Sequence, residues 1–213
     1  MLAARTILAS LMWACLCGSG IAQPAVDLAL AAPSHKQVLA DFLMDYMQVR
    51  YPLAPYEGCV LYISVKQQRM YYVVDQEMMA EYVISTSKNG LGCARNSERT
   101  PEGLHRIVQK IGAGVPAYGI FRWRHFTGAI ADSNVERDDL ITSRILWLDG
   151  MEPGVNEGGA KDSMERGIYI HGTADEASLG RPSSHGCIRM RNSDVIQLFD
   201  HVTLGTLVVI LDN

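Results

Sequence analysis

The chain has 213 residues, 48% of them hydrophobic, and a formal net charge of −4 at pH 7. The basic residues form no run, so the charge pattern is not that of a nucleic-acid-binding protein, and we expect no nucleic acid as a partner. The length allows one domain with a substantial core and a short extension.

The first residues are typical of a secretion signal. Arg5 precedes an apolar run at residues 7–16 that is too short to span a bilayer, and small residues follow around Ala22. We therefore expect a signal peptide over residues 1–22, cleavage after it, and export to the periplasm, the cell envelope or the medium. The alternative is an uncleaved signal, which is also the one membrane contact that the sequence suggests.

The cysteines fit an exported protein in which one thiol stays unpaired. Cys15 and Cys17 leave with the signal, so the mature chain keeps Cys59, Cys93 and Cys187. An odd count in an oxidising compartment implies a free thiol or a bond between chains. A Cys59–Cys93 disulfide is one alternative. We favour two unpaired thiols there, because Cys59 lies in an alternating apolar run that predicts a strand.

An amphipathic helix is predicted in the N-terminal extension, residues 23–56. Apolar side chains recur at helical spacing between residues 26 and 51, and Pro52 and Pro55 end the pattern. We expect the helix to pack on the main domain; docking onto a partner or the cell wall is the alternative.

Beyond Pro55 the apolar period changes from that of a helix to that of a strand. An antiparallel meander is predicted by three runs, at residues 59–65, 70–74 and 79–85. A loop rich in Gly, Asn and Ser over residues 87–99 then leads through Thr100-Pro101-Glu102-Gly103 into a strand over residues 104–108. We expect this loop at the mouth of a site.

The stretch from residue 112 to 167 is irregular apart from one apolar run, residues 140–148. Long connections of this kind are usually functional or mobile, so we interpret it as a lid or cleft wall. Its aromatic and basic residues supply three candidate substrate-binding side chains, Tyr118, Arg122 and Trp123. A half-buried aromatic cluster is the alternative.

The C-terminal part is predicted to hold two strands, at residues 168–170 and 188–190, a helix over residues 193–199 and a last strand over residues 207–211. Asn192 or Ser193 is the expected helix cap. These elements make the chain mainly β, in the α+β class, with few helices.

One thiol and two imidazoles frame the candidate site. His171 ends a predicted strand, and Cys187 begins another one sixteen residues later. If these strands are neighbours, the imidazole and thiol meet at one edge of the sheet, as a Cys/His pair for acyl transfer requires. The amides of Gly186 and Cys187 are natural oxyanion donors. The residues alone leave open whether His171 or His185 is the base.

Three other interpretations compete with acyl transfer. The two histidines and Cys187 could be structural core groups, or a redox-active thiol with its neighbours. They could also be three ligands of Zn²⁺, although the His185-Gly186-Cys187 spacing is unlike that of common zinc pairs. We expect neither a metal nor a cofactor.

The motifs resemble those of a known family. Ile168-Tyr169-Ile170-His171-Gly172-Thr173, followed by Ser184-His185-Gly186-Cys187-Ile188-Arg189-Met190, resembles the signature of the L,D-transpeptidase catalytic domain family, also called YkuD-like. Thr100-Pro101-Glu102-Gly103 resembles the Thr-Pro-x-Gly start of a strand in that family. The resemblance implies a catalytic domain over residues 57–213, built of packed mixed β-sheets with a few flanking helices and a long lid loop.

The resemblance also implies a reaction on peptidoglycan stem peptides. Cys187 would attack the carbonyl of the third, diamino-acid residue of a tetrapeptide, release the terminal D-alanine and form a thioester that an amine acceptor resolves. The acceptor would be a second stem in a 3-3 cross-link, a wall-anchored protein, or a D-amino acid that exchanges with the terminal one. Water as acceptor would make the protein a cysteine amidase or L,D-carboxypeptidase. A non-catalytic wall-binding domain is the rival from another class, and it has no need of a paired thiol.

Roles for the remaining site residues follow from the same resemblance. His171 would be the base, oriented by the Gly172 carbonyl, while His185 would support the site and shape the oxyanion pocket with Gly186. Ser184 would hold the loop by hydrogen bonding. Arg189 would steady the site or face a substrate carboxylate.

Overall fold

The computed structural model describes residues 34–54, 58–132 and 139–213. The expected signal peptide and the first residues of the expected N-terminal helix lie outside this part. The helices are α1 (His35–Arg50), α2 (Asn192–His201) and the short 3-10 turns η1 (Gly159–Lys161) and η2 (Glu176–Ser178). The strands are β1 (Cys59–Ser64), β2 (Arg69–Val74), β3 (Glu77–Ser85), β4 (Gly103–Ile111), β5 (Gly119–Arg122), β6 (His125–Ile130), β7 (Ile141–Gly150), β8 (Tyr169–Gly172), β9 (Ile188–Met190) and β10 (Leu207–Leu211).

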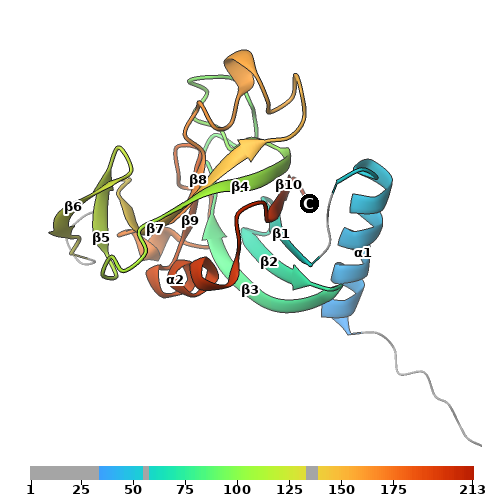
Figure 1. The fold of residues 1–213 in the computed structure, drawn as a ribbon, viewed down its shortest axis with the longest axis horizontal. Coiled ribbons are helices and arrows are strands. Elements are labelled where there is room, and N and C mark those ends of the chain that lie inside the picture. Colours follow the sequence, from blue (N-terminus) through green and yellow to red (C-terminus); the bar gives the residue numbers. More distant parts are fainter. Residues whose placement is uncertain (1–33, 55–57, 133–138) are drawn as a thin grey trace, which may run out of the picture. The chain divides into compact units, whose positions relative to one another are not determined.

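The strands form one mixed sheet that closes on itself (Figure 1). Their order is β4-β10-β1-β2-β3-β9-β8-β7-β5-β6, and β4 also pairs with β7. Closure pairs β4 with β7, while β6 stays an edge strand. The predicted mainly β class is confirmed, and the predicted meander is present as the antiparallel pairs β1–β2 and β2–β3. The mixed strand pairing expected from the sequence is present within this one sheet.

The main core lies on the inward face of this sheet. Alternate residues of the strands supply it, since successive side chains point to opposite faces. Leu61, Ile107, Leu146 and Ile170 belong to one buried cluster, and α2 adds Leu198 to it. Full burial of such a side chain contributes about 2 kcal/mol. The inward face is therefore filled by packed apolar side chains, and we expect the candidate site on another face of the sheet.

Helix α1 packs on the outward face of β1 and β2. Ser34 caps it by accepting a hydrogen bond from the Gln37 amide at 3.2 Å. Its buried residues Ala40, Leu43 and Met47 lie at helical spacing, in a cluster that also contains Tyr62 of β1. The prediction of an N-terminal helix packed on the domain is confirmed.

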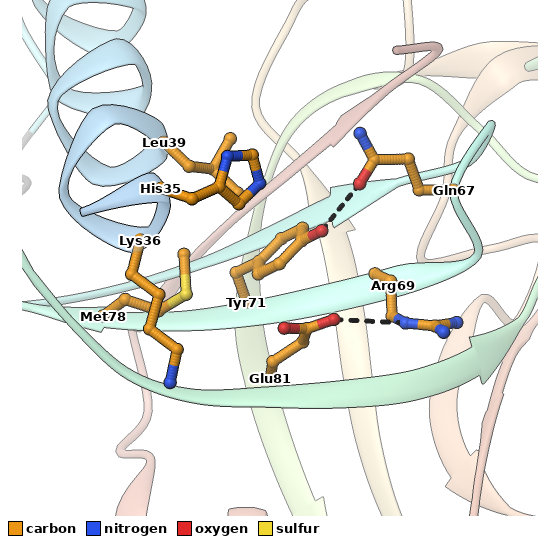
Figure 2. A pocket seen from close by; sticks show the side chains of 8 residues that line it. All are labelled: His35, Lys36, Leu39, Gln67, Arg69, Tyr71, Met78 and Glu81. Carbon is orange, nitrogen blue, oxygen red and sulfur yellow. Dashed lines mark hydrogen bonds and ion pairs between the residues drawn. The ribbon is translucent and has the colours of Figure 1, made fainter.

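Both ends of α1 meet polar groups of the domain. A pocket of about 280 Å³ lies at its first turn, and His35 and Lys36 are among the residues that line it. In this pocket the Tyr71 hydroxyl donates to Gln67 at 2.7 Å (Figure 2). At the other end, Arg50 and Tyr51 bond to the Glu152 carboxylate at 2.9 and 2.8 Å. Glu152 also accepts from the Leu104 amide at 2.7 Å, which ties the helix to the start of β4.

Two local features differ from expectation. The β5–β6 hairpin lies in the stretch expected to be irregular, and its turn places Trp123 and Arg124 at φ values of 50° and 67°, which residues other than glycine rarely adopt. Helix α2 has Arg191 as its N-cap residue instead of Asn192 or Ser193. The Glu176 carboxylate accepts from the Asn192 amide at 2.8 Å, so a distant acid serves the helix terminus.

Candidate active site

The strands that carry His171 and Cys187 are direct neighbours, which is the condition for the imidazole and the thiol to meet at one edge of the sheet. β8 and β9 pair in parallel, with Ile170 opposite Ile188, and Cys187 immediately precedes β9. The two isoleucines point into the main core. Because side chains alternate along a strand, His171 and Cys187 lie on the opposite face, where Cys187 packs against a second cluster that includes Tyr169. The thiol and the imidazole therefore share one face of the sheet.

The His171 imidazole is held in a defined orientation. Its side chain is 1% exposed, and Nδ1 lies 2.7 Å from the Gly172 carbonyl oxygen. A carbonyl only accepts, so Nδ1 carries the hydrogen and Nε2 keeps a lone pair. No described residue hydrogen-bonds to Nε2. Burial lowers the pKa of His171 despite the opposing effect of the Asp139 charge, so the ring is neutral at pH 7.

The Cys187 thiol is protonated in the resting site. Its Sγ donates to the Gly167 carbonyl oxygen at 3.4 Å. Burial raises the pKa of Cys187 to about 12, and the positive charges of Arg189 and Arg166 offset only part of that rise. A raised thiol pKa beside a lowered imidazole pKa disfavours a thiolate–imidazolium pair. The thiol therefore becomes a nucleophile only if a base removes its proton during the reaction.

The loop before Cys187 is fixed by the two sequence motifs together. Thr100 donates through Oγ1 to the Gly186 carbonyl at 2.9 Å, and Ser184 donates through Oγ to the Cys187 carbonyl at 2.6 Å. Gly186 has φ +129°, in the region that favours glycine, and a Cβ there would lie 3.4 Å from the Arg99 carbonyl.

The Gly186 amide differs from its expected role as a free oxyanion donor. It donates instead to Ser184 Oγ at 3.2 Å, because the turn folds the serine hydroxyl back under the loop. In this arrangement Ser184 both accepts from Gly186 and donates to Cys187. The serine therefore binds the backbone on both sides of the loop, and the Gly186 amide is occupied.

His185 has both ring nitrogens occupied. Nδ1 lies 2.7 Å from Asp139 Oδ2, and Nε2 lies 2.9 Å from Lys88 Nζ. A lysine ammonium only donates, so Nε2 accepts and Nδ1–H donates to the carboxylate. The side chain is 44% exposed. His185 is thus a bridge between a cation and an anion at the rim of the site.

Asp139 is the residue that the sequence did not reveal. Its Oδ1 accepts from Arg189 Nε at 2.8 Å and Nη2 at 2.6 Å, while Oδ2 accepts from His185. Burial raises the pKa of Asp139, but the interactions with His171 and Arg189 and the hydrogen bonds from His185 and Arg189 outweigh it, so the pKa is lowered and the group is a carboxylate. Arg189 is 3% exposed. The Arg189 guanidinium is therefore engaged by Asp139. This fits a role in steadying the site and leaves the guanidinium unable to contact a substrate.

Two clefts flank the thiol. One, of about 360 Å³, is lined by Trp123, Arg124, Gly167 and Tyr169 among others, and Gly167 is the residue that accepts from Sγ. The other, of about 240 Å³, is lined by Arg95, Asn96, Ile168 and His185 among others. Glu165 and Arg166 line both. Cys187 itself is not among the residues that line these two clefts, but both are lined by residues beside it.

The candidate substrate-binding residues of the long connection lie in different places. Trp123, 87% exposed at the hairpin turn, lines the larger cleft. Tyr118 donates through its hydroxyl to Glu176 at 3.1 Å, and Arg122 is exposed at the end of β5; neither lines either cleft. Phe121 of the same segment is buried in the cluster beside Cys187. The aromatic segment is therefore partly core and partly cleft wall.

The competing interpretations can be compared with the geometry. Cys59, Cys93 and Cys187 are free thiols. Within residues 34–54, 58–132 and 139–213, no group of three or more His, Cys, Asp or Glu side chains is arranged to hold a metal ion. In the same part of the chain, no helix has the length and apolar character needed to cross a membrane.

The chain matches the model of one protein family over most of its length. Residues 60–210 match the model of the YkuD family, described as the L,D-transpeptidase catalytic domain. YqjB of Bacillus subtilis, whose name as an L,D-transpeptidase is provisional, is 28% identical over 151 residues, which are 71% of this chain and 70% of that protein. ErfK/SrfK of Salmonella typhimurium, also provisionally named, is 54% identical over 43 residues, 20% of this chain and 14% of that protein.

Solved L,D-transpeptidase structures also match. The enzyme from Mycobacterium smegmatis aligns with a TM-score of 0.45 and 16% identity, over 72% of this chain and 58% of that chain. Bd1075 of Bdellovibrio bacteriovorus aligns with a TM-score of 0.48 and 17% identity, over 74% of this chain and 49% of that chain. The alignments span less than two thirds of both solved chains.

Proposed function

Because this chain belongs to the L,D-transpeptidase catalytic domain family, we propose that it is an exported cysteine acyltransferase that acts on peptidoglycan stem peptides. One observation carries the proposal. Cys187 and His171 share a face of the paired strands β8 and β9, and the imidazole presents an unbonded Nε2 on the face that carries the thiol. A neutral thiol beside a neutral, oriented base is the starting state for nucleophilic acyl transfer.

The first half-reaction forms a thioester. His171 Nε2 takes the thiol proton as Cys187 Sγ attacks the carbonyl carbon of the third residue of a tetrapeptide stem. The bond from that carbon to the nitrogen of the terminal D-alanine then breaks, and the imidazolium returns the proton to the departing amine. The Gly172 carbonyl, which holds Nδ1–H at 2.7 Å, stabilises the imidazolium while it exists.

The second half-reaction resolves the thioester. An acceptor amine attacks the same carbonyl carbon, His171 takes a proton from that amine, and the bond from carbon to Sγ breaks. The thiolate regains its proton from the imidazolium, so the site returns to its neutral state. Two clefts lined by residues beside the thiol favour transfer, because donor and acceptor then need not compete for one space. A stem amine or a wall-anchored protein is the acceptor class we propose.

The geometry favours His171 over His185 as the base. His185 accepts from Lys88 at Nε2 and donates to Asp139 at Nδ1, so it has no nitrogen free to receive a proton from the thiol. Asp139 connects His185 to Arg189, which lies opposite His171 in the strand register. We assign His185, Asp139 and Arg189 to positioning of the site.

The first test asks whether Cys187 is the nucleophile. The mature protein, incubated with a carbapenem, is expected to gain the mass of one adduct at Cys187, as measured by intact mass spectrometry and peptide mapping. Cys187→Ala gains none. An unmodified wild type, or an equal adduct on Cys187→Ala, contradicts the proposal. Cys59→Ala and Cys93→Ala are the matched controls, because both remove a free thiol and leave the adduct in place.

The second test asks what the acceptor is. With a disaccharide tetrapeptide as substrate, dimers indicate transfer to a stem amine, whereas tripeptide monomers alone indicate hydrolysis by a carboxypeptidase. Export is tested separately by fractionating cells that produce the full chain and sequencing the N-terminus of the mature protein. Cleavage after residue 22 supports it, and an intact N-terminus retained in the cytosol contradicts it.

A further inference from the structure

Arg166 lies between the two clefts that flank the thiol. Its side chain lines both of them, and the next residue, Gly167, accepts the hydrogen bond from Cys187 Sγ at 3.4 Å. Gly186, which precedes Cys187, lies close to the Arg99 carbonyl, to which Arg166 donates. Arg166 is therefore linked to the segment around the reacting sulfur through Gly167 and through Arg99.

The Arg166 guanidinium is held by neutral groups. Nη2 donates to the Arg99 carbonyl at 2.6 Å, and Nη1 donates to the Gly92 carbonyl at 3.3 Å. None of the ion pairs among the described residues includes Arg166. Burial lowers the pKa of Arg166, although a guanidinium stays charged throughout the ordinary pH range. The Arg166 guanidinium is thus a half-buried cation, held in a defined orientation, that forms no ion pair with an acidic side chain among the described residues.

The other cations near the thiol are already engaged. Arg189 and Arg166 are the two positive groups whose charges act on Cys187, and Arg189 is buried against Asp139. Arg124 lines the larger cleft, but its guanidinium stacks 4.3 Å from the centre of the Trp147 ring. Arg166 alone combines closeness to the thiol, access to both clefts and the lack of an acid partner among the described residues.

We propose that Arg166 binds the terminal carboxylate of the donor peptide, an inference that rests on the proposed transpeptidase function. In a tetrapeptide donor this carboxylate lies one residue beyond the scissile carbonyl, a span of about 3.8 Å along the chain. A cation beside the sulfur is therefore at the right range when Sγ contacts the carbonyl. The Gly92 and Arg99 carbonyls orient the guanidinium beforehand, and its N–H groups that bond to neither carbonyl can donate to the carboxylate.

This assignment makes Arg166 a specificity determinant. A donor that ends after the fourth residue places its carboxylate on the guanidinium, whereas a donor extended by one residue, or capped as an amide, brings a neutral group there. A hydrogen bond to a charged group contributes enough for a preference of about tenfold to a hundredfold. The leaving amino acid keeps its carboxylate, so the contact acts on the donor and not on the acceptor amine.

The experiment pairs a change in the enzyme with a change in the substrate. A synthetic tetrapeptide stem is prepared with its terminal D-alanine as the free acid and as the carboxamide, and kcat/KM for release of that residue is measured by mass spectrometry. Wild type is expected to prefer the acid by about tenfold to a hundredfold. Arg166→Gln reduces the ratio to nearly one, and Arg166→Lys restores part of it.

The control separates this contact from general loss of positive charge. Arg124→Gln removes a cation from the same cleft and is expected to keep the acid-to-amide ratio. A wild-type ratio near one, an unchanged ratio in Arg166→Gln, or a loss of the ratio in Arg124→Gln overturns the proposal. A third peptide keeps its terminal carboxylate and is amidated on the side carboxylate of the diamino acid instead. Wild type is expected to process it with the kcat/KM of the free-acid peptide; a kcat/KM as low as that of the terminal carboxamide assigns Arg166 to the side carboxylate.

A binding measurement keeps the proposal testable if catalysis is absent. Cys187→Ala protein is titrated with the acid and the amide peptides by calorimetry, and the acid is expected to bind more tightly only when Arg166 is present. Tighter binding of the acid without carbapenem adduct formation on wild type means that the carboxylate site is real and the proposed reaction is wrong. Equal binding of both peptides, with normal adduct formation, means that the proposed reaction stands and that Arg166 does not bind the terminal carboxylate.

Discussion

Two buried histidines, His105 on β4 and His171 on β8, look alike until their second nitrogen is considered. His105 is 0% exposed and His171 is 1% exposed. Nδ1 of each lies next to a backbone carbonyl, Gly103 at 3.1 Å and Gly172 at 2.7 Å. Burial lowers the pKa of both, in His105 to about 4. His105 Nε2, however, lies 3.0 Å from Ser163 Oγ, whereas His171 Nε2 has no bonding partner among the described residues.

The comparison shows that burial and a lowered pKa do not identify a base. Any neutral imidazole in the interior has both properties, because burial disfavours the charged form. The two sites differ in what remains unsatisfied: His105 joins β4 to the segment after η1 through Ser163, and His171 keeps a lone pair on the face that carries Cys187. The structural histidine and the candidate base thus differ by one hydrogen bond, the one at Nε2.

The largest expected effect tests that difference directly. His171→Gln is expected to lower the rate constant for acylation of Cys187 by about 10²- to 10⁴-fold, because a positioned general base contributes that much. His105→Gln is the matched control and leaves the rate constant of the folded fraction unchanged. Stopped-flow acylation by a carbapenem measures both, with circular dichroism to report the folded fraction. Equal losses in the two variants would erase the distinction.

A second prediction uses His105 as a probe of stability. Its pKa is about 4 in the folded chain and about 6.5 when unfolded, so the unfolded state binds more protons between these values. The stabilising contribution is complete above pH 6.5 and is lost as the pH falls toward 4, a total of about 3 kcal/mol. Urea unfolding at pH 7 and pH 4.5 measures it. His105→Gln should flatten the dependence; an unchanged slope would show that His105 does not titrate as described.

The same comparison shows what the sequence can and cannot predict. Strands β9 and β10 have the predicted bounds, because alternating or continuous apolar runs with turn residues on either side leave little ambiguity. The β5–β6 hairpin was missed because β6 is exposed along its whole length and its turn contains Trp123 and Arg124, where glycine or asparagine is usual. Exposed strands carry no burial pattern to detect.

The site was predicted where it is local and missed where it is distant. His171 and Cys187 are close in sequence and border two apolar runs that predict strands, whereas the parallel pairing of these strands is seen only in the folded chain. Asp139 lies 46 residues before His185, and only the folded chain brings them together. Nothing in the sequence separates it from the acidic residues around it, since its role depends on the buried Arg189 opposite.

The third prediction concerns that distant residue. Asp139→Asn leaves the buried Arg189 guanidinium without its anion, and we expect a loss of about 2 kcal/mol in the free energy of unfolding, less than for a fully buried pair because Asp139 is 28% exposed. Urea denaturation measures it. Arg106 and Asp149 form a pair in which the arginine is 47% exposed, so Asp149→Asn is the matched control and should cost less than about 1 kcal/mol. Equal costs would mean that burial of Arg189 does not matter.

The smallest expected effect is at the second histidine of the motif. His185→Gln keeps a side chain that can bond to Asp139, and removal of the imidazole affects a group with both nitrogens already occupied. We expect the rate of Cys187 acylation to fall by less than about tenfold, the value of one hydrogen bond. Its pH profile should keep the wild-type acid limb, which lies below pH 6.5 because burial lowers the pKa of His171 and only the neutral ring accepts a proton. A loss as large as that of His171→Gln, together with a displaced acid limb, would transfer the role of base to His185 and show that an exposed imidazole can break its bond to Lys88 during the reaction.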